Sequence, residues 1–209
     1  EWLLTNSRGG YSSSTVIGCN TRRYHGMLTG SLDPPVNRIM ALSQCMEMVI
    51  ARKGVYKLST FDFGDTFSPE GYVNITGFRQ DSGVHFDYTL GSIKLTKSVY
   101  LMRDSDTVVM VYHFKKIKEP VELTLRPLVG LRDFHSLQRS SASLSMKNVG
   151  NAVLIGHDTP DSPELCLNCP NSFFEKTRNG GSTLIIEKTW KEARISSKTS
   201  GAPVYSSHR

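Results

Sequence analysis

The sequence predicts an all-β fold, and three observations carry this prediction. Apolar and polar residues alternate with a period of two from about residue 84 to residue 157, which is typical of strands with one buried face. Turns that contain glycine recur between these segments. No segment before residue 174 combines helical periodicity with helix caps. Many short strands with almost no helix favour a two-sheet sandwich or a barrel.

Three hairpins are predicted, each from two strand-like segments that flank a short turn. They are 38–51 with 55–58 around Arg52-Lys53-Gly54, 84–90 with 93–101 around Gly91-Ser92, and 144–149 with 152–156 around Gly150-Asn151. In the second hairpin glycine stands where the turn requires a positive φ. Beyond them, residues 183–186 form the one strand-like segment near the end of the chain.

Two further strands are predicted after the segment 93–101. Residues 107–114 hold apolar side chains on both faces, which predicts a strand in the middle of a sheet. Residues 121–126 alternate between apolar and polar side chains, and the strand is expected to end at Pro127. Together with 93–101 these segments predict an antiparallel meander.

Composition limits the class of protein. The chain of 209 residues is 38% hydrophobic and 21% charged, which is ordinary for a globular domain with a core of its own. No apolar run approaches the roughly 20 residues of a membrane-spanning helix, and the start at Glu1 lacks the layout of a secretory signal. We expect a cytoplasmic protein without a membrane partner, processed or cut from a longer product.

The net charge of +6 does not indicate a nucleic-acid partner. Lys and Arg exceed Asp and Glu by four within residues 175–209, which leaves an excess of two for the remaining 174 residues. A nucleic-acid site needs basic residues clustered on one face of a folded domain. Cys166 and Cys169 have zinc-ligand spacing, but no second ligand pair accompanies them, so reduced surface thiols are expected. No motif indicates a metal or an organic cofactor.

Two ordered blocks of sequence resemble one known family. The first contains residues 1–6 (EWLLTN), 9–11 (GGY), 20–26 (NTRRYHG) and 34–35 (PP) followed by Arg38, and the second contains 123–128 (LTLRPL) and 132–137 (RDFHSL). This combination resembles the amino-terminal domain of bacterial and archaeal glycogen debranching enzymes of the amylo-α-1,6-glucosidase type. The resemblance covers roughly residues 1–174.

The resemblance implies an antiparallel two-sheet supersandwich, similar to galactose-mutarotase domains, over residues 1–174. In the family this domain precedes an α/α toroid that carries the catalytic acids. We therefore expect a non-catalytic domain that packs on such a toroid in a glycoside hydrolase and helps to position α-glucan, without catalytic residues of its own. Residues 175–209 depart from the family pattern and are expected to form a loop-rich, partly disordered tail.

The candidate sugar-binding residues come from the two blocks. They are Tyr11, Arg22, Arg23, Tyr24, His25, Asp133 and His135. Such side chains supply planar hydrogen-bonding groups for vicinal hydroxyls and aromatic faces for sugar rings. On a strand, residues 22 and 24 would face one side and residues 23 and 25 the other, so at most half of this cluster can reach one ligand.

Other roles for these residues also fit the sequence. A purely structural role for residues 22–25 is as plausible as a sugar site, with arginines paired to carboxylates inside the domain or at a partner. Asp133 could orient His135 or hold Arg22 or Arg23, and both readings place the second block near the first. A free-standing α-glucan-binding module and, as a weaker alternative, a mutarotase-like enzyme with His and Glu as acid and base also fit.

Overall fold

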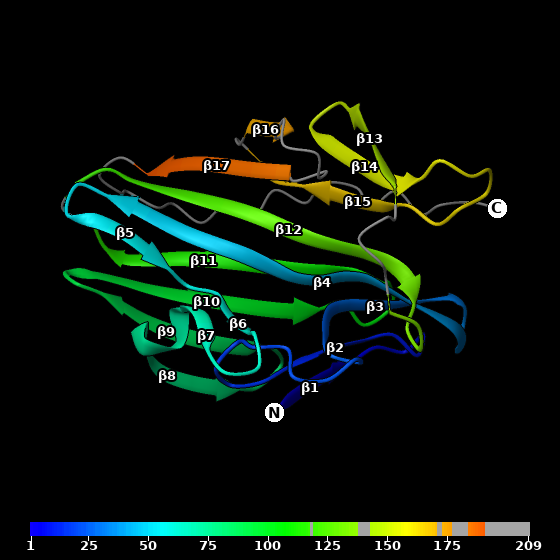
Figure 1. The fold of residues 1–209 in the computed structure, drawn as a ribbon, viewed down its shortest axis with the longest axis horizontal. Coiled ribbons are helices and arrows are strands. Elements are labelled where there is room, and N and C mark those ends of the chain that lie inside the picture. The colour runs from blue at the N-terminus through cyan, green and yellow to red at the C-terminus, as the bar shows by residue number, and fades with distance from the viewer. Residues whose placement is uncertain (118, 138–142, 171–172, 177–183, 191–209) are drawn as a thin grey trace.

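The computed structural model describes residues 1–117, 119–137, 143–170, 173–176 and 184–190. In this part of the chain no helix is long and apolar enough to cross a membrane. The one helical element in it is a short 3-10 turn, η1 (Gly71–Asn74). The predicted all-β class is confirmed (Figure 1).

Two antiparallel sheets form the main layers (Figure 1). The large sheet has the order β1 (Trp2–Thr5), β2 (Tyr11–Ser14), β3 (Gly26–Asp33), β4 (Val36–Ala51), β12 (Val121–Asp133), β17 (Leu184–Trp190) and β16 (Phe173–Lys176), and β5 (Gly54–Lys57) also pairs with β4. The second sheet has the order β11 (Val108–Lys116), β10 (Ile93–Leu101), β9 (Val84–Leu90) and β8 (Ile75–Gln80).

Two small sheets complete the described part of the chain. One consists of β13 (Leu144–Val149), β14 (Ala152–His157) and β15 (Leu165–Asn168), and the other of β6 (Thr60–Asp62) and β7 (Phe67–Glu70). His157 links the first of these to the large sheet, because its Nε2 lies 2.9 Å from the carbonyl oxygen of Leu131.

The hydrophobic core lies between the two main layers. Alternate residues of β9, from Val84 to Leu90, are buried together with Val121, Leu123 and Leu125 of β12. All of them belong to one core cluster that draws on both sheets, so the fold is a sandwich. Of the two architectures that the strand pattern allowed, the structure selects the sandwich and excludes the barrel.

The three predicted hairpins are confirmed. β4 pairs with β5, β9 with β10 and β13 with β14, all antiparallel. Gly91 and Gly150 take φ values of 61° and 58°, as their turns require. The strand predicted at residues 183–186 is seen as β17, which pairs with β12. The domain boundary at residue 174 stays a prediction, and most of the predicted tail lies outside the described residues.

The predicted meander is wrong in three respects. Strand β11 lies at the end of its sheet, with Val109 and Val111 exposed, so apolar residues on both faces did not indicate a central strand. After β11 the chain crosses to the other layer, where β12 pairs with β4. Finally, β12 does not end at Pro127 but continues to Asp133. Pairing between β12 and β17 stops at Leu125. Pro127 therefore has no partner on β17, and its missing N–H removes no hydrogen bond from that ladder.

Candidate functional site

Residues 21–25 form a turn that leads into β3, not a strand. The N–H of His25 donates to the carbonyl of Arg22 at 3.0 Å, and β3 begins at Gly26. A Cβ at Gly26 would lie 2.0 Å from Sδ of Met40, so a larger residue at this entry into the sheet would have to displace the end of the Met40 side chain. The prediction that residues 22–25 alternate between two faces is therefore wrong in its mechanism, because a turn does not follow strand alternation.

The four side chains of this turn nevertheless separate into two pairs. Arg22 and His25 turn toward the amino terminus, where Nε of Arg22 donates to Oε1 of Glu1 at 2.6 Å. His25 is buried, and its Nδ1 accepts the N–H of Thr21 at 3.1 Å, which places the ring proton on Nε2, 3.6 Å from Glu1. Burial lowers the pKa of His25, and the hydrogen bond from Arg22 lowers the pKa of Glu1. These contacts hold the turn together.

Arg23 and Tyr24 turn instead toward the second block. Nη1 of Arg23 donates to the carbonyl of His135 at 2.9 Å, and the hydroxyl of Tyr24 lies 3.2 Å from Nδ1 of the same residue. In return, Nη2 of Arg132 donates to the carbonyl of Arg23 at 2.9 Å. The prediction that the two sequence blocks lie near each other is confirmed.

Aromatic rings gather at this meeting point. The ring of Tyr24 lies 5.5 Å from that of Phe134 and 5.8 Å from that of His135, and the last two rings are 4.0 Å apart. The guanidinium of Arg38 stands 5.7 Å from the centre of the Phe134 ring. We use the name Tyr24 surface for the group formed by Arg23, Tyr24, Phe134 and His135. Tyr24 is 42% exposed, and His135 is also exposed, so both are accessible to a ligand.

Tyr11 lies directly behind the Tyr24 surface. It begins β2, and its hydroxyl donates to the carbonyl of Tyr24 at 2.9 Å. Partial burial raises the pKa of Tyr11, while the charges of Arg38 and Arg132 oppose that rise. The glycine pair before Tyr11 packs closely against another segment of the same chain, because a Cβ at Gly10 would lie 2.6 Å from Oδ1 of Asp106. Tyr11 therefore supports the turn that carries Tyr24.

Asp133 takes a role that neither sequence reading predicted. Its Oδ1 accepts the backbone N–H of His135 at 2.8 Å and so shapes the end of β12. It neither orients the His135 ring nor pairs with Arg22 or Arg23. The adjacent Arg132 donates from Nη1 to the carbonyls of residues 133, 134 and 136, so the loop closes around its guanidinium. Burial lowers the pKa of Arg132, and the charge of Arg23 adds to this effect, whereas Tyr11 and Asp133 oppose it.

Phe134, Arg38 and Arg132 were not among the predicted site residues. All three stand in the two sequence blocks, and that shared position is the signal that could have identified them. Alternation and residue type do not reveal which side chains of the two blocks face each other. That depends on the pairing of β12 with β4, in which Asp133 lies opposite Ile39.

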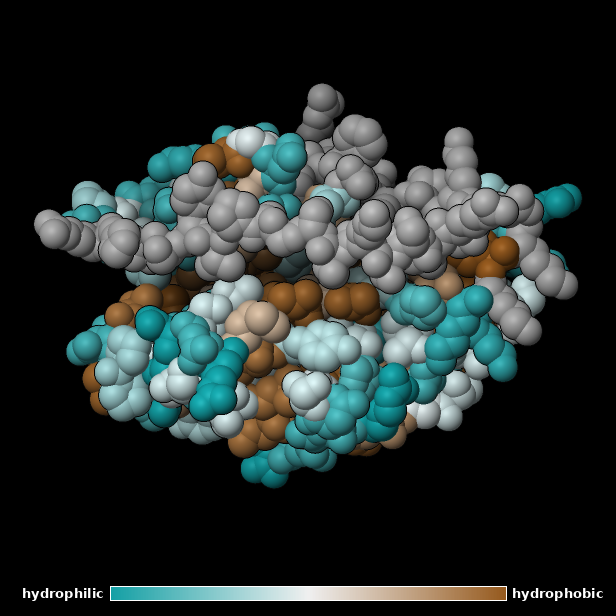
Figure 2. Space-filling model, turned by 180° about the vertical axis from the view of Figure 1, so that it is seen from behind, coloured by the Kyte–Doolittle hydropathy of each residue, from teal (hydrophilic) through white to brown (hydrophobic). Residues whose placement is uncertain are grey.

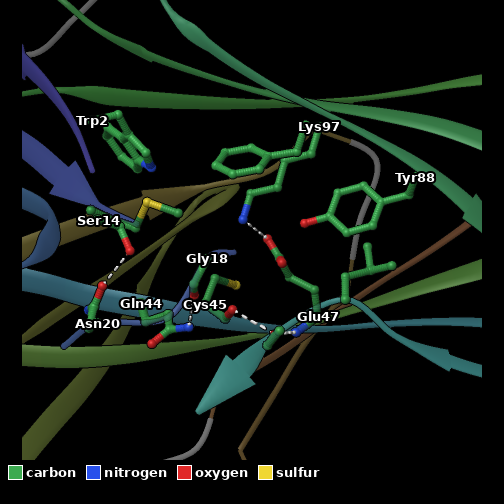
Figure 3. A pocket seen from close by; sticks show the side chains of 13 residues that line it. Trp2, Ser14, Gly18, Asn20, Gln44, Cys45, Glu47, Tyr88 and Lys97 are labelled. Atoms are coloured by element: carbon green, nitrogen blue, oxygen red, sulfur yellow. Dashed lines mark hydrogen bonds and ion pairs between the residues drawn. The ribbon is translucent and has the colours of Figure 1, made fainter. Parts of the chain in front are cut away.

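A second polar cluster lies inside the sandwich (Figure 3). Nζ of Lys97, on β10, lies 2.6 Å from Oε1 of Glu47, on β4, and these side chains are only 7% and 1% exposed. Tyr112 donates its hydroxyl to Glu47, and burial raises the pKa of Tyr112 and of Tyr88 well above the usual range. The cavity beside the ion pair measures about 10 Å³, the space of about one water molecule and too small for a sugar.

The four cysteines carry free thiols, with Cys19 and Cys45 buried and Cys166 exposed. Burial raises the pKa of both buried thiols, which keeps them protonated and unreactive. Over the residues that the structure describes, no group of three His, Cys, Asp or Glu side chains could hold a metal ion.

Comparison with known families identifies a family that the chain matches. The family model described as "Glycogen debranching enzyme N terminal" matches residues 1–192, a span that includes both sequence blocks and the whole Tyr24 surface. Neither the search of curated proteins nor the search of solved structures gives a match. Because the family model covers most of the chain and the fold is the all-β sandwich expected from the two blocks, the chain belongs to the family of glycogen debranching enzyme N-terminal domains.

Proposed function

We propose that this domain is a non-catalytic part of a glycogen debranching enzyme, a cytoplasmic α-1,6-glucosidase, and that it helps to position α-glucan through the Tyr24 surface. The observation that carries the proposal is the meeting of the two sequence blocks, in which Arg23 and Tyr24 both contact His135 across more than a hundred residues of chain. Two segments so distant in sequence create this surface only when the sandwich is folded.

The Tyr24 surface offers the chemistry that sugar recognition uses. Exposed rings of Tyr24 and His135 present faces against which a pyranose ring can lie. The N–H groups of Arg23 that are not used by His135 can donate to hydroxyls in a planar fork. A glucan chain that lies along such a surface needs no deep pocket.

The non-catalytic role is supported by the carboxylates. Glycoside hydrolysis requires two carboxyl groups about 5 to 9.5 Å apart across the scissile bond. At the Tyr24 surface the carboxylate in contact is Asp133, and it is committed to the backbone of His135. Glu47 is buried inside the sandwich beside a cavity of about 10 Å³, which also disfavours the mutarotase-like alternative.

Packing on a toroid is supported by apolar side chains that remain exposed. Leu137, two residues beyond His135, is 70% exposed, and Val109 and Val111 of β11 are also exposed. Figure 2 shows hydrophobic residues that gather along the middle of the rear face. Exposed apolar area of this kind is typical of a domain that packs against another.

Glucan binding is tested by affinity electrophoresis in gels that contain glycogen. We expect the chain to be retarded, and Tyr24→Ala and His135→Ala to reduce the retardation because they remove ring faces from the surface. His113→Ala is the matched control, since His113 is exposed on β11 in the other sheet. A wild-type mobility that glycogen does not change would contradict the proposal.

The partner is tested with a separately produced α/α-toroid domain of a debranching enzyme. Binding to the toroid that Leu137→Asp weakens, while Phe63→Asp does not, would support the accessory role; both side chains are 70% exposed. Retardation by glycogen without any binding to the toroid would favour the free-standing module instead.

A further inference from the structure

Three arginines, one within the Tyr24 surface and two beside it, form no ion pair with a carboxylate. Arg23 donates to the carbonyl of His135, Arg38 donates from Nε to the carbonyl of Gly9 at 2.7 Å, and Arg132 donates to four carbonyls. Among the ion pairs of the described residues, none involves any of the three guanidinium groups. Carbonyl oxygens satisfy hydrogen bonds, but they carry no full negative charge to neutralise a guanidinium group.

Three other arginines among the described residues are neutralised directly by carboxylates. Arg8 pairs with Asp106 at 3.2 Å, Arg22 with Glu1 at 2.6 Å and Arg79 with Asp87 at 3.1 Å. The three arginines at the Tyr24 surface therefore differ from these in the charge of their partners. The nearby acid, Asp133, accepts the backbone N–H of His135, and its charge acts on Arg132 rather than forming an ion pair with Arg23 or Arg38.

The charges of the three arginines act on the same small part of the structure. Tyr11 experiences the charges of both Arg38 and Arg132, and Arg132 experiences the charge of Arg23. Arg38 also stands over the ring of Phe134. Like charges held together in this way repel one another, and binding an anion removes that repulsion.

Donor groups remain for such an anion. The hydrogen bond of Arg38 uses Nε, and that of Arg23 uses one Nη1 proton, so N–H groups of both guanidinium planes stay available. A planar guanidinium matches the oxygens of a phosphate with two parallel hydrogen bonds. The rings of Tyr24 and His135 occupy the same surface, so the anion and a sugar ring can belong to one ligand.

We propose that the Tyr24 surface recognises α-glucan that carries phosphate monoesters, with Arg23 and Arg38 holding the phosphate oxygens and the rings of Tyr24 and His135 holding the sugar. This inference rests on the proposed function and names the class of glucan. A protein surface rich in carboxylates would use the same guanidinium groups, but it would not need sugar-stacking rings beside them. Binding involves no covalent step.

The test uses one polymer in two forms. Affinity electrophoresis compares amylopectin that carries phosphate monoesters with the same amylopectin after enzymatic removal of its phosphate. We expect the phosphorylated form to bind about tenfold more tightly, as one charge-assisted bidentate contact allows. The difference should shrink as ionic strength rises, because salt screens exposed charges. Titration with inorganic phosphate and with glucose 6-phosphate separates the anion from the sugar, and glucose 6-phosphate should bind more tightly.

Variants locate the site. Arg23→Gln and Arg38→Gln should each remove most of the preference for the phosphorylated polymer, whereas Arg38→Lys should retain part of it. Arg52→Gln is the matched control, because Arg52 is an exposed arginine in the β4–β5 turn, at the other end of β4 from Arg38. Thermal melts of every variant establish that the domain remains folded.

The outcomes are distinct. Equal retardation by both polymers would overturn the phosphate inference and leave the proposed glucan contact standing. A phosphate preference that survives both glutamine variants would also overturn it, since the anion would then bind elsewhere. Retardation by neither polymer would contradict the proposed function as well. Arginine variants that lose toroid binding while keeping the phosphate preference would assign the guanidinium groups to a protein partner.

Discussion

The hydroxyl of Tyr24 lies 3.2 Å from Nδ1 of His135, although 111 positions separate the two residues. Arg23 and Arg132 reinforce this contact, each by donating to a carbonyl of the opposite block. The pair explains why two short blocks of sequence, far apart in the chain, carry the family resemblance together. Each block completes the local structure of the other.

The buried ion pair makes Lys97 essential to stability. Lys97→Met should lower the free energy of unfolding by about 3–5 kcal/mol, because Glu47 then remains charged inside the sandwich without its partner. Urea denaturation measures the change. The double variant Lys97→Met with Glu47→Leu should be closer to wild type than Lys97→Met alone. If the single variant were as stable as wild type, the pair would not be buried as described.

Arg132 is expected to order the loop that carries His135. Arg132→Gln should speed amide hydrogen exchange over residues 133–137, because the carbonyls of this loop lose their shared guanidinium donor. Exchange in the β9–β10 hairpin, in the other sheet, serves as the internal control. Unchanged exchange at residues 133–137 would show that the strand end is rigid without Arg132.

A larger side chain at Gly26 should be accommodated only by displacing Met40. Gly26→Ala should cost about 1–3 kcal/mol of stability, because the new Cβ would lie 2.0 Å from Sδ of the fully buried Met40. Gly77→Ala is the control, since its Cβ would meet Asp87 at an ordinary 3.4 Å. Shortening Met40 to Val in the Gly26→Ala background should restore part of the loss. Equal melting temperatures for the two alanine variants would refute the close approach.

Asp81 should contribute to acid stability. A hydrogen bond from His85, followed by one from the N–H of Gly83, lowers the pKa of Asp81 to about 2. Because the folded pKa is lower than the unfolded value of about 3.9, this stabilisation is present above pH ~4 and is lost as the pH falls toward 2. In urea titrations, the difference in stability between wild type and Asp81→Asn should narrow across that range. A difference independent of pH would argue against an ionised Asp81.

Alternation alone predicted much of the sandwich. Hairpins such as the one at Gly91 involve neighbouring segments, so local turn chemistry and a period of two suffice to identify them. The same alternation contained a signal that was not used, because Lys97 stands between Leu95 and Val99 on the inward face of β10. A lysine at such a position indicates a buried carboxylate opposite, here Glu47.

Sequence by itself therefore determined the fold class, the hairpins, the family and the candidate site residues. These depend on local pattern and on residue identity. Only the tertiary structure decided that β12 leaves the meander to pair with β4, because nothing local distinguishes one partner strand from another. That pairing brings Phe134 and His135 to the turn of residues 21–25. The folded turn itself directs Arg22 and His25 toward Glu1, where they hold the turn, and Arg23 and Tyr24 toward His135.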